Sequence, residues 1–489
     1  MPFGESMKIG LLNQAGKYLT HGHNSINTST SELQINQIWE MTQVNTREGK
    51  PVVFLKSQEG LNLLVTKEGN VNCGYTESPE HLQGLFLLIV HQNKNWSLKS
   101  LSSQKYLESD EENVFCSEEV LSPEHQWTPH LALHAHVVLY HPQSDKYAQT
   151  DVNQHRVLVD ISTPYLETCG FVLRFRSGKY YLETANHLFL SSESTLEQES
   201  SPKTAFAMDL RPGCRARFIN QEGLFMYPQG TQNILLPGQK PFSNQEWFVI
   251  RRCPPWVSLK SRKHGYLTIF YGKDVKANSQ SLTINSVFHY EMDTGTRMVR
   301  LSDKESNYLA LRKRNIILAN GSKNEKETAY KVRWTFGKMY LRACNDAYLS
   351  ICDTGYVLAK TNTPGADEEF ILRLYNRSFL VLKGCYGYIG QSSDGDIVQC
   401  NRPVPECIEI IPCKMIIYYF KGQGKMFWNM TNHKTFHSNG QSPGIFYIEI
   451  RGKNILTIMT YTGMFLRGDK SGILIGDSDR VTSECLWEF

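Results

Sequence analysis

The 489-residue chain lacks any apolar run near the roughly 18 to 20 residues that a membrane-spanning helix needs. Its first residues also lack the apolar stretch of a secretory signal. No Pro/Gly/Ser-rich linker divides it, and no segment has the spacing of an amphipathic helix. With 40% hydrophobic and 20% charged residues, the composition is globular rather than disordered. We therefore expect a cytoplasmic protein with no membrane insertion.

The 12 cysteines lack the spacing of a zinc site or a disulfide framework. Even the nearest group, Cys400, Cys407 and Cys413, is spaced too widely for a zinc knuckle. We expect reduced, mostly buried thiols, with no metal and no cofactor. The five Asn-X-Ser/Thr sequons then predict no glycosylation, which belongs to secreted proteins.

The net charge of +4 hides an uneven distribution. Residues 1–132 carry 9 Lys/Arg against 15 Asp/Glu, a net of −6, whereas residues 251–340 carry 18 against 7, a net of +11. The total is too small for a general nucleic-acid binder. The basic segment instead favours an acidic macromolecular partner, although such runs are most often solvated hairpins.

A repeat of about 40 residues organises the chain. A turn followed by an aromatic or large aliphatic residue occurs twelve times, from AGKYLT (15–20) to YTGMFLRG (461–468). An alternating strand precedes each turn, a short hairpin follows it, and most repeats close with a bulky strand such as QIWEM (37–41) or CLWEF (485–489). Four short strands and no helix match one lobe of a β-trefoil.

Twelve lobes make four trefoils, so the predicted fold is all-β, with four tandem β-trefoil domains packed as one rigid body. The expected domains are residues 1–132, 133–253, 254–376 and 377–489, joined by short connections. Two six-bladed propellers are the alternative, because the repeat count alone does not exclude them.

Three short motifs are explained better by the repeat than by chemistry. GQGK (422–425) lacks the first glycine and the hydroxyl of a phosphate-binding loop and aligns with the other repeat turns. Arg467-Gly468-Asp469 spells an adhesion tripeptide but occupies a hairpin turn. The QIW triplet (37–39) resembles the QxW signature of sugar-binding trefoils, yet it occurs once, which favours core packing of its tryptophan.

No convergent set of catalytic residues is present, and we expect no enzyme. Four histidines near the first domain boundary are the candidate metal ligands: His130, His134, His136 and His141. They lie on an expected strand and linker with no carboxylate or cysteine alongside, which argues against a closed metal site.

Several segments resemble the fascin family over the full chain, among them GLLNQAGKYLT (10–20), LETANHLFL (182–190), LRGDKSGIL (466–474) and LWEF (486–489). LALHAHVVLY (131–140) and NRSFLVLKGCYGYIG (376–390) are similar to testis-type members. The resemblance implies a monomeric cytoskeletal protein that cross-links actin filaments without catalysis, and a role in spermatid and sperm-head actin. Cross-linking requires at least two filament-binding faces.

The resemblance also implies a filament face formed by the first and last trefoils. Lys17 holds the lysine of the family's GNKYLT segment, Arg467 replaces a lysine, and Lys470 keeps positive charge nearby. The family's basic run before QIW is here the uncharged stretch from Leu33 to Asn36, preceded by Glu32 in place of a phosphorylatable serine. In fascins the phosphorylated state of that serine weakens filament binding. A carboxylate at this position imitates the phosphate, although one carboxylate is a poor copy of it.

We therefore expect most of the electrostatic attraction to the filament to come from the third trefoil, at Arg312, Lys313 and Arg314. A solvated hairpin is the competing interpretation of that run. Two other functions stay open: a cytosolic four-trefoil scaffold or single-site actin binder with weakened bundling, and a sugar- or lipid-binding trefoil module.

Overall fold

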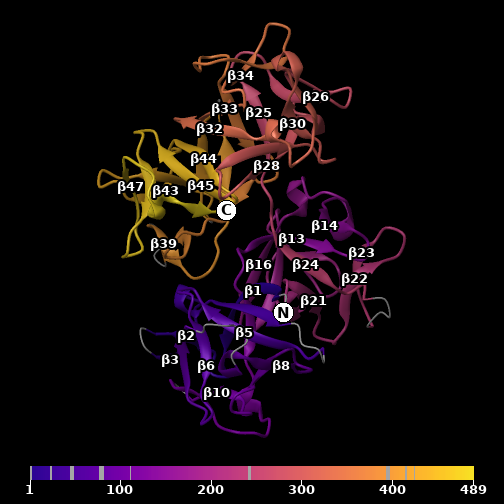
Figure 1. Cartoon of the computed structure of the whole chain (residues 1–489), viewed down its shortest axis with the longest axis vertical. Helices are drawn as coiled ribbons and strands as arrows, with labels where there is room; N and C mark the ends of the chain where they lie inside the picture. The colour runs from indigo at the N-terminus through magenta and orange to yellow at the C-terminus, as the bar shows by residue number, and fades with distance from the viewer. Residues whose placement is uncertain are drawn as a thin grey trace. The chain divides into compact units, whose positions relative to one another are not determined.

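The computed structural model describes residues 3–22, 25–44, 49–75, 82–110, 112–239, 244–392, 397–413, 416–422 and 424–489. Within these ranges the regular structure consists of 48 β-strands and nine 3-10 turns (Figure 1). No helix in this part of the chain is long and apolar enough to cross a bilayer. The turns are η1 (Ile35–Gln37), η2 (Leu82–Gly84), η3 (Pro123–His125), η4 (Glu167–Cys169), η5 (Pro202–Thr204), η6 (Ile284–Ser286), η7 (Lys313–Asn315), η8 (Lys326–Thr328) and η9 (Ser483–Cys485).

The strands fall into four sets of twelve. The first trefoil contains β1 (Phe3–Leu12), β2 (Tyr18–His21), β3 (Ile26–Ser29), β4 (Trp39–Val44), β5 (Val52–Ser57), β6 (Asn62–Val65), β7 (Val71–Gly74), β8 (Phe86–Val90), β9 (Trp96–Ser100), β10 (Leu107–Ser109), β11 (Val114–Cys116) and β12 (Thr128–Leu131). The second contains β13 (His136–His141), β14 (Lys146–Asp151), β15 (Arg156–Ile161), β16 (Phe171–Arg176), β17 (Lys179–Thr184), β18 (Phe189–Leu190), β19 (Leu196–Glu197), β20 (Ala207–Arg211), β21 (Arg215–Ile219), β22 (Phe225–Gln229), β23 (Ile234–Gly238) and β24 (Phe248–Arg252).

The third trefoil contains β25 (Trp256–Ser261), β26 (Tyr266–Phe270), β27 (Asp274–Ser279), β28 (Val287–Met292), β29 (Met298–Ser302), β30 (Tyr308–Leu311), β31 (Ile317–Gly321), β32 (Tyr330–Thr335), β33 (Lys338–Arg342), β34 (Tyr348–Ile351), β35 (Val357–Thr361) and β36 (Phe370–Leu374). The fourth contains β37 (Phe379–Leu380), β38 (Tyr388–Gln391), β39 (Val398–Arg402), β40 (Ile408–Pro412), β41 (Tyr418–Lys421), β42 (Phe427–Met430), β43 (Phe436–Gly440), β44 (Phe446–Gly452), β45 (Ile455–Thr460), β46 (Phe465–Gly468), β47 (Leu474–Ser478) and β48 (Trp487–Glu488).

The pairing within a set is that of a β-trefoil. In the third trefoil, six strands form a closed antiparallel ring in the order β25, β28, β29, β32, β33, β36 and back to β25. The other six form the hairpins β26–β27, β30–β31 and β34–β35, one for each lobe. Four strands per repeat and three lobes per barrel confirm the predicted fold class.

A buried hydrogen bond in several lobes ties the closing strand to the hairpin of the same lobe. Trp39 Nε1 donates to the Leu19 carbonyl oxygen (3.0 Å), and Trp127 Nε1 donates to that of Leu107 (3.0 Å). Tyr330 takes the same role, its hydroxyl donating to the Leu309 carbonyl oxygen at 2.9 Å. The bulky residue that ends each repeat is therefore a core anchor, which supports the structural interpretation of QIW.

Gln37 completes that interpretation, because it is fully buried and caps its own turn. Its Oε1 accepts the Gln34 N–H (2.7 Å), while its Nε2 donates to the Ser29 carbonyl oxygen (3.0 Å) and to Thr30 Oγ1 (2.8 Å). Buried polar groups of this kind need such partners. The two defining residues of the QxW motif, Gln37 and Trp39, are thus both buried and hydrogen-bonded within the first trefoil.

The chain forms two compact units: unit 1 is residues 1–162 with 171–252, and unit 2 is residues 163–170 with 253–489. Each has a continuous apolar core, which runs from Met7 to Ile250 in unit 1 and from Val257 to Phe489 in unit 2. Each unit therefore holds two trefoils. The predicted domain limits, and the rigid packing of all four trefoils, stay predictions.

The short segment 163–170 belongs to unit 2, although the sequence placed it in the second domain. Its Thr163 hydroxyl donates to the Lys304 carbonyl oxygen (3.2 Å), and its Glu167 Oε1 accepts the Ser378 N–H (2.8 Å). The repeat pattern gave no sign of this, because the segment is a loop outside the repeated strands.

A charged network is buried in the second trefoil. Arg217 donates from Nε (3.0 Å) and Nη2 (2.7 Å) to Asp209 Oδ2, and from Nη1 to Glu246 Oε1 (3.0 Å). The side chains of Asp209 and Glu246 are 1% and 0% exposed, whereas that of Arg217 is 12% exposed. Its guanidinium also lies 4.7 Å from the centre of the Trp247 ring. Arg217 therefore pairs with two buried carboxylates at once, and Arg211 Nε lies 3.1 Å from the second oxygen of Asp209.

The cysteines match their expected state only in part. Six of the 12 cysteines are buried. Cys344 and Cys385, however, are exposed, each at or beside a repeat turn, where burial does not reach the side chain. The buried six are Cys116 and Cys400 on strands, Cys169 and Cys485 in 3-10 turns, and Cys253 and Cys407 in loops, so half of the cysteines meet the expectation of burial.

Candidate functional site

Three hairpins close one end of the third barrel and carry its basic side chains. Each hairpin turn rests on the second strand of a neighbouring hairpin. The Ala319 N–H donates to the Lys273 carbonyl oxygen, and the Ala277 N–H donates to that of Gly355, both at 2.8 Å. Because these contacts are made by the backbone, the side chains of the turns are left to face solvent.

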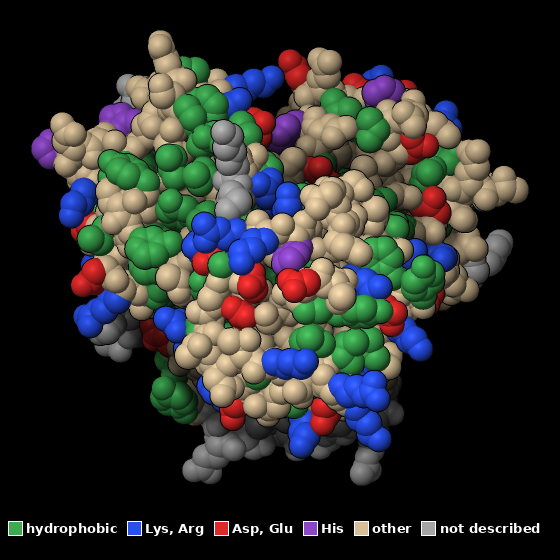
Figure 2. Space-filling model, turned by 90° about the horizontal axis from the view of Figure 1, so that it is seen from above, with side chains coloured by type: hydrophobic (Ala, Val, Ile, Leu, Met, Phe, Trp, Pro, Cys, Tyr) green, Lys and Arg blue, Asp and Glu red, His purple; other side chains and the backbone are tan. Residues whose placement is uncertain are grey.

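We define the third-trefoil cap by the five cations that these hairpins present: Lys273, Lys276, Lys313, Arg314 and Lys360. Four of them are exposed, and Lys276 is half-buried with its Nζ 4.2 Å above the centre of the Tyr356 ring. Asp274 and Asp353 lie on the same hairpins, so the cap keeps an excess of positive charge. Figure 2, seen from above the view of Figure 1, shows Lys and Arg side chains spread over that side of the molecule with Asp and Glu side chains among them.

The three predicted residues of the basic run have different surroundings. Arg312 is half-buried, with Nη1 2.6 Å from Glu325 Oε2 and with hydrogen bonds to the side chain and carbonyl oxygen of Asn320 (2.8 and 3.0 Å). The hydrogen bond from Arg312 is the first cause that lowers the pKa of Glu325 to about 2. Lys313 and Arg314 are exposed and, within the described ranges, form no ion pair. Arg312 thus supports the loop, and the other two present charge.

The fourth trefoil shows the same division between a held arginine and an exposed lysine. Arg467 makes a two-pronged pair with Asp477, Nε to Oδ1 at 2.7 Å and Nη2 to Oδ2 at 2.9 Å, which raises the arginine pKa and lowers that of Asp477. Asp469 Oδ1 accepts the N–H groups of Ser471 (3.0 Å) and Ile473 (2.8 Å). The Arg467-Gly468-Asp469 triplet is therefore engaged in its own turn, while Lys470 beside it is exposed.

The first-trefoil candidates lie on two short loops of unit 1. Lys17 is half-buried in the turn before β2, where its backbone N–H donates to Asn13 Oδ1 (2.8 Å). Glu32 and Asn36 are exposed, and Asn36 Nδ2 donates to the His21 carbonyl oxygen at 3.4 Å. Since Arg467 and Lys470 belong to unit 2, a single face shared by both groups stays a prediction.

The cap of the first trefoil carries the opposite charge. Its hairpin turns expose the acidic residues Glu68, Asp110 and Glu112. Hydrogen bonds from Thr66 and from Asn113 are the first causes that lower the pKa values of Glu68 and Asp110 respectively. Both carboxylates are thus charged at neutral pH, which places the net −6 of residues 1–132 partly on this cap.

Sequence reasoning missed three exposed lysines: Lys273 and Lys360 on the third-trefoil cap and Lys434 on the fourth. They are isolated in the sequence and gather only when hairpins from different lobes meet. Their position in the repeat could have indicated them, because Lys273 and Lys434 each lie in the hairpin that follows a repeat turn.

The remaining sequence candidates have structural surroundings. His130 accepts or donates a hydrogen bond with Tyr18 Oη (2.7 Å) and stacks on Phe175 with ring centres 4.0 Å apart, whereas His141 bonds Ser144 Oγ at 2.7 Å. Of GQGK, Gln423 lies outside the described residues, and Gly422 and Lys425 form the hairpin turn between β41 and β42.

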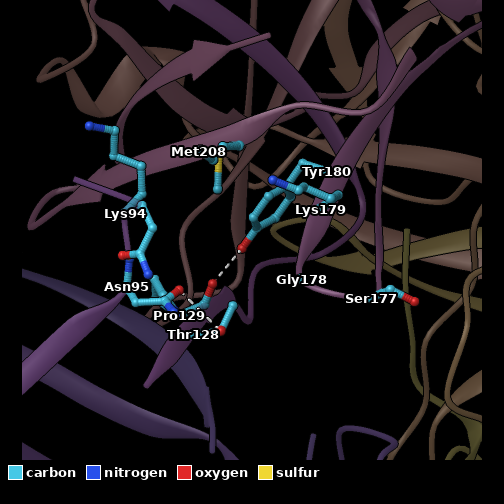
Figure 3. Close-up of a pocket in the computed structure, with 11 residues that line it drawn as sticks. Lys94, Asn95, Thr128, Pro129, Ser177, Gly178, Lys179, Tyr180 and Met208 are labelled. Atoms are coloured by element: carbon cyan, nitrogen blue, oxygen red, sulfur yellow. Dashed lines mark hydrogen bonds between the residues drawn. The ribbon is translucent and has the colours of Figure 1, made fainter. Parts of the chain in front are cut away.

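Unit 1 contains an open pocket of about 250 Å³ between its first and second barrels. It is lined by Lys94, Asn95, Thr128, Lys179 and Tyr180 among others (Figure 3). The buried Tyr180 hydroxyl donates to the Pro129 carbonyl oxygen (3.1 Å) and accepts the Leu131 N–H (2.8 Å), and burial raises its pKa. The tyrosine therefore joins β12 to β17.

Residues 262–372 match the family description "Fascin domain". Over its full length the chain is 42% identical to Fascin-3 of Mus musculus and 40% identical to Fascin-3 of Homo sapiens, covering 98% of each. The chain belongs to the fascin family. It is also 26% identical over 99% of its length to Fascin-2 of Bos taurus, of which it covers 98%.

Members of the fascin family are cytoskeletal proteins that bundle actin filaments, so the basic cap of this fascin is a candidate filament contact. Among solved structures, a mosquitocidal holotoxin matches 99% of the chain with a TM-score of 0.24 and 11% identity, and this likeness supports no argument.

Proposed function

We propose that this chain is a non-catalytic actin-filament cross-linker of the cytoplasm that acts as a monomer in spermatid and sperm-head actin. The observation that carries the proposal is its full-length identity of 40% and 42% to two Fascin-3 proteins. The exposed Lys313 and Arg314 add a physical reason, because unpaired cations on a rigid cap attract an acidic filament and make its binding sensitive to salt.

The proposed filament contacts are Lys313 and Arg314 on the third-trefoil cap, and Lys17 and Lys470 elsewhere. Arg312 and Arg467 are proposed as supports for these loops, since their guanidinium groups are held by Glu325 and Asp477. Contacts that are individually weak suffice, because each filament engages many copies of the protein at once.

Sedimentation with actin filaments tests the proposal. We expect the full chain to pellet with filaments at low speed, which reports bundles, and the double variant Lys313→Gln/Arg314→Asn to pellet several-fold less. Arg297→Asn is the matched control: Arg297 is also an exposed arginine with a left-handed backbone (φ 56° against 63° for Arg314), but it lies in the β28–β29 turn away from the cap. Equal bundling by all three proteins would contradict the role of the cap.

A second candidate function is a single-site actin binder or scaffold with weakened bundling. It is favoured by Glu32 and Asn36, which are exposed and leave that loop of the first trefoil without positive charge. Pelleting at high speed alone would support the single-site binder, and no pelleting at either speed would support the scaffold.

A further inference from the structure

Two large aromatic side chains are exposed on neighbouring turns of unit 2. Phe336, in the turn between β32 and β33, is 56% exposed, and Tyr461, in the turn between β45 and β46, is 63% exposed. The turns touch, since a Cβ built on Gly463 would lie 3.2 Å from Phe336 Cε1. Single exposed apolar residues are common on protein surfaces, but a pair on adjoining turn tips is a feature to explain.

Backbone preference does not account for Phe336. Phe336 and Gly337 have φ angles of 48° and 72°, the pair of left-handed residues of a two-residue hairpin turn. Such turns strongly favour Asn-Gly, and a bulky aromatic residue is disfavoured at the first position. An aromatic residue at this position is therefore neither buried nor favoured by the turn.

The turn is nevertheless held firmly in place. The Gly337 N–H donates to Glu449 Oε1 (3.2 Å), and Trp334 Nε1 donates to the Ile450 carbonyl oxygen (3.1 Å). Both acceptors are on β44, and Figure 1 shows β32 and β33 beside β44 and β45. The aromatic ring is thus presented on an ordered tip.

Two exposed cations lie on the hairpin that carries Phe336. Lys331 and Arg333 are exposed on the same face of β32, and Lys331 lies directly opposite Arg342 on β33. Arg342 is itself paired with the exposed Asp346 (Nη2 to Oδ1 3.5 Å). Two other nearby carboxylates are buried and already paired. Glu369 lies 2.9 Å from Lys338 Nζ, and Glu449 pairs with a neighbouring arginine of β44.

We propose that this aromatic ridge, defined by Phe336, Tyr461, Lys331 and Arg333, docks on an anionic lipid surface. The rings would lie at the level of the headgroups, where aromatic side chains are favoured, and the two cations would face the acidic lipids. Turn tips are convex, and a convex aromatic tip flanked by cations suits a bilayer interface. The inference needs no filament contact and goes beyond the proposed function.

Lipid binding of this kind is weak, reversible and sensitive to salt, because it combines a small apolar contact with a few charges. Co-sedimentation of the full chain with vesicles of phosphatidylserine mixed with phosphatidylcholine measures it, and vesicles of phosphatidylcholine alone are the reference. We expect binding to the mixed vesicles at low salt and little binding to the neutral ones.

Phe336→Asn separates docking from folding. The change creates Asn-Gly, so we expect a higher unfolding temperature together with weaker vesicle binding. Arg333→Glu should weaken binding by at least roughly five-fold, since one cation near an anionic surface contributes about that factor. Tyr271→Asn is the matched control. Tyr271 is 91% exposed and precedes a glycine in the same backbone geometry (φ 51° and 74°), but it lies on the hairpin between β26 and β27.

The proposal predicts that Tyr271→Asn binds mixed vesicles as the unchanged chain does. It is overturned if the unchanged chain fails to bind them, or if Phe336→Asn and Tyr461→Ser bind them equally well. Ridge variants that keep vesicle binding but lose filament bundling would assign the ridge to a protein contact and would also overturn it. Filament sedimentation of the same variants keeps this result separate from the test of the cap.

Discussion

Replacement of Arg217 by methionine should destabilise unit 1 strongly. Methionine keeps the length of the side chain but removes the three hydrogen bonds to Asp209 and Glu246, whose side chains are 1% and 0% exposed. Breaking a buried ion pair by removal of one partner costs about 3 to 5 kcal/mol, because the other charge is left uncompensated. Arg211 Nε, 3.1 Å from Asp209 Oδ1, still neutralises part of the charge. We therefore expect a loss of about 3 to 4 kcal/mol.

Differential scanning calorimetry measures the effect, because the two units can unfold as separate transitions. A loss of that size corresponds to roughly 6 to 16 °C for a unit of this length, confined to the transition of unit 1. Arg215→Met is the matched control, since Arg215 is exposed and its guanidinium lies 5.3 Å from the centre of the same Trp247 ring.

The charge argument has its own check in the double variant Arg217→Met/Glu246→Gln. Removal of the uncompensated carboxylate should recover part of the stability that Arg217→Met loses. If Arg217→Met shifts the transition no more than Arg215→Met does, or if the added Glu246→Gln lowers stability further, the reasoning is wrong.

Two further predictions concern the third trefoil. The pKa of Glu291 is lowered to about 2 by hydrogen bonds, first from His289 and also from Lys323 and Tyr308, so its contribution to stability is present above about pH 4.5 and is lost as the pH falls toward 2. Glu291→Gln should remove up to roughly 3 kcal/mol at neutral pH and flatten the stability curve of unit 2 below pH 4.5, and an unchanged curve would refute this. Arg312→Ala should cost about 1 kcal/mol through its two hydrogen bonds to Asn320 and reduce bundling less than the Lys313→Gln/Arg314→Asn pair does. A larger loss of bundling with normal stability would make Arg312 a filament contact.

The fold could be predicted from the sequence because each repeat contains local signals for its own strands and turns. Period-two alternation defines the strands, and the bulky closing residue marks each lobe, so that Trp39 and Trp127 are recognisable anchors. Tyr330 shows that the anchor need not be tryptophan. Phe86 and Phe288 are fully buried at the same place after η2 and η6, so the requirement is for a buried ring, with or without a donor. The place of segment 163–170 could not be predicted, because its partners, such as Lys304 and Ser378, are set by tertiary packing.

The candidate site could be predicted less well, because charge in the sequence does not show which cations are already paired. Arg312 and Arg467 have the same chemistry as Arg314, yet both guanidinium groups are held by carboxylates that lie 13 and 10 residues further on. Conversely, Lys273 and Lys360 are far apart in the sequence and meet only when the three hairpins close the barrel. Which cations face solvent is decided by tertiary pairing.

The contacts between hairpin turns and neighbouring strands in the third-trefoil cap have a consequence for how such proteins diversify. Since the backbone of Lys273 makes one of these contacts, its side chain is not needed for the barrel and can change, whereas the left-handed backbone of Gly355 (φ 83°) restricts the other position. The exposed Glu68 and Asp110 of the first trefoil and the cations of the third occupy corresponding turns of one architecture. Surface charge can therefore be reversed in this fold with little loss of stability. We expect relatives with the same backbone to differ in their affinity for a charged partner before they differ in structure.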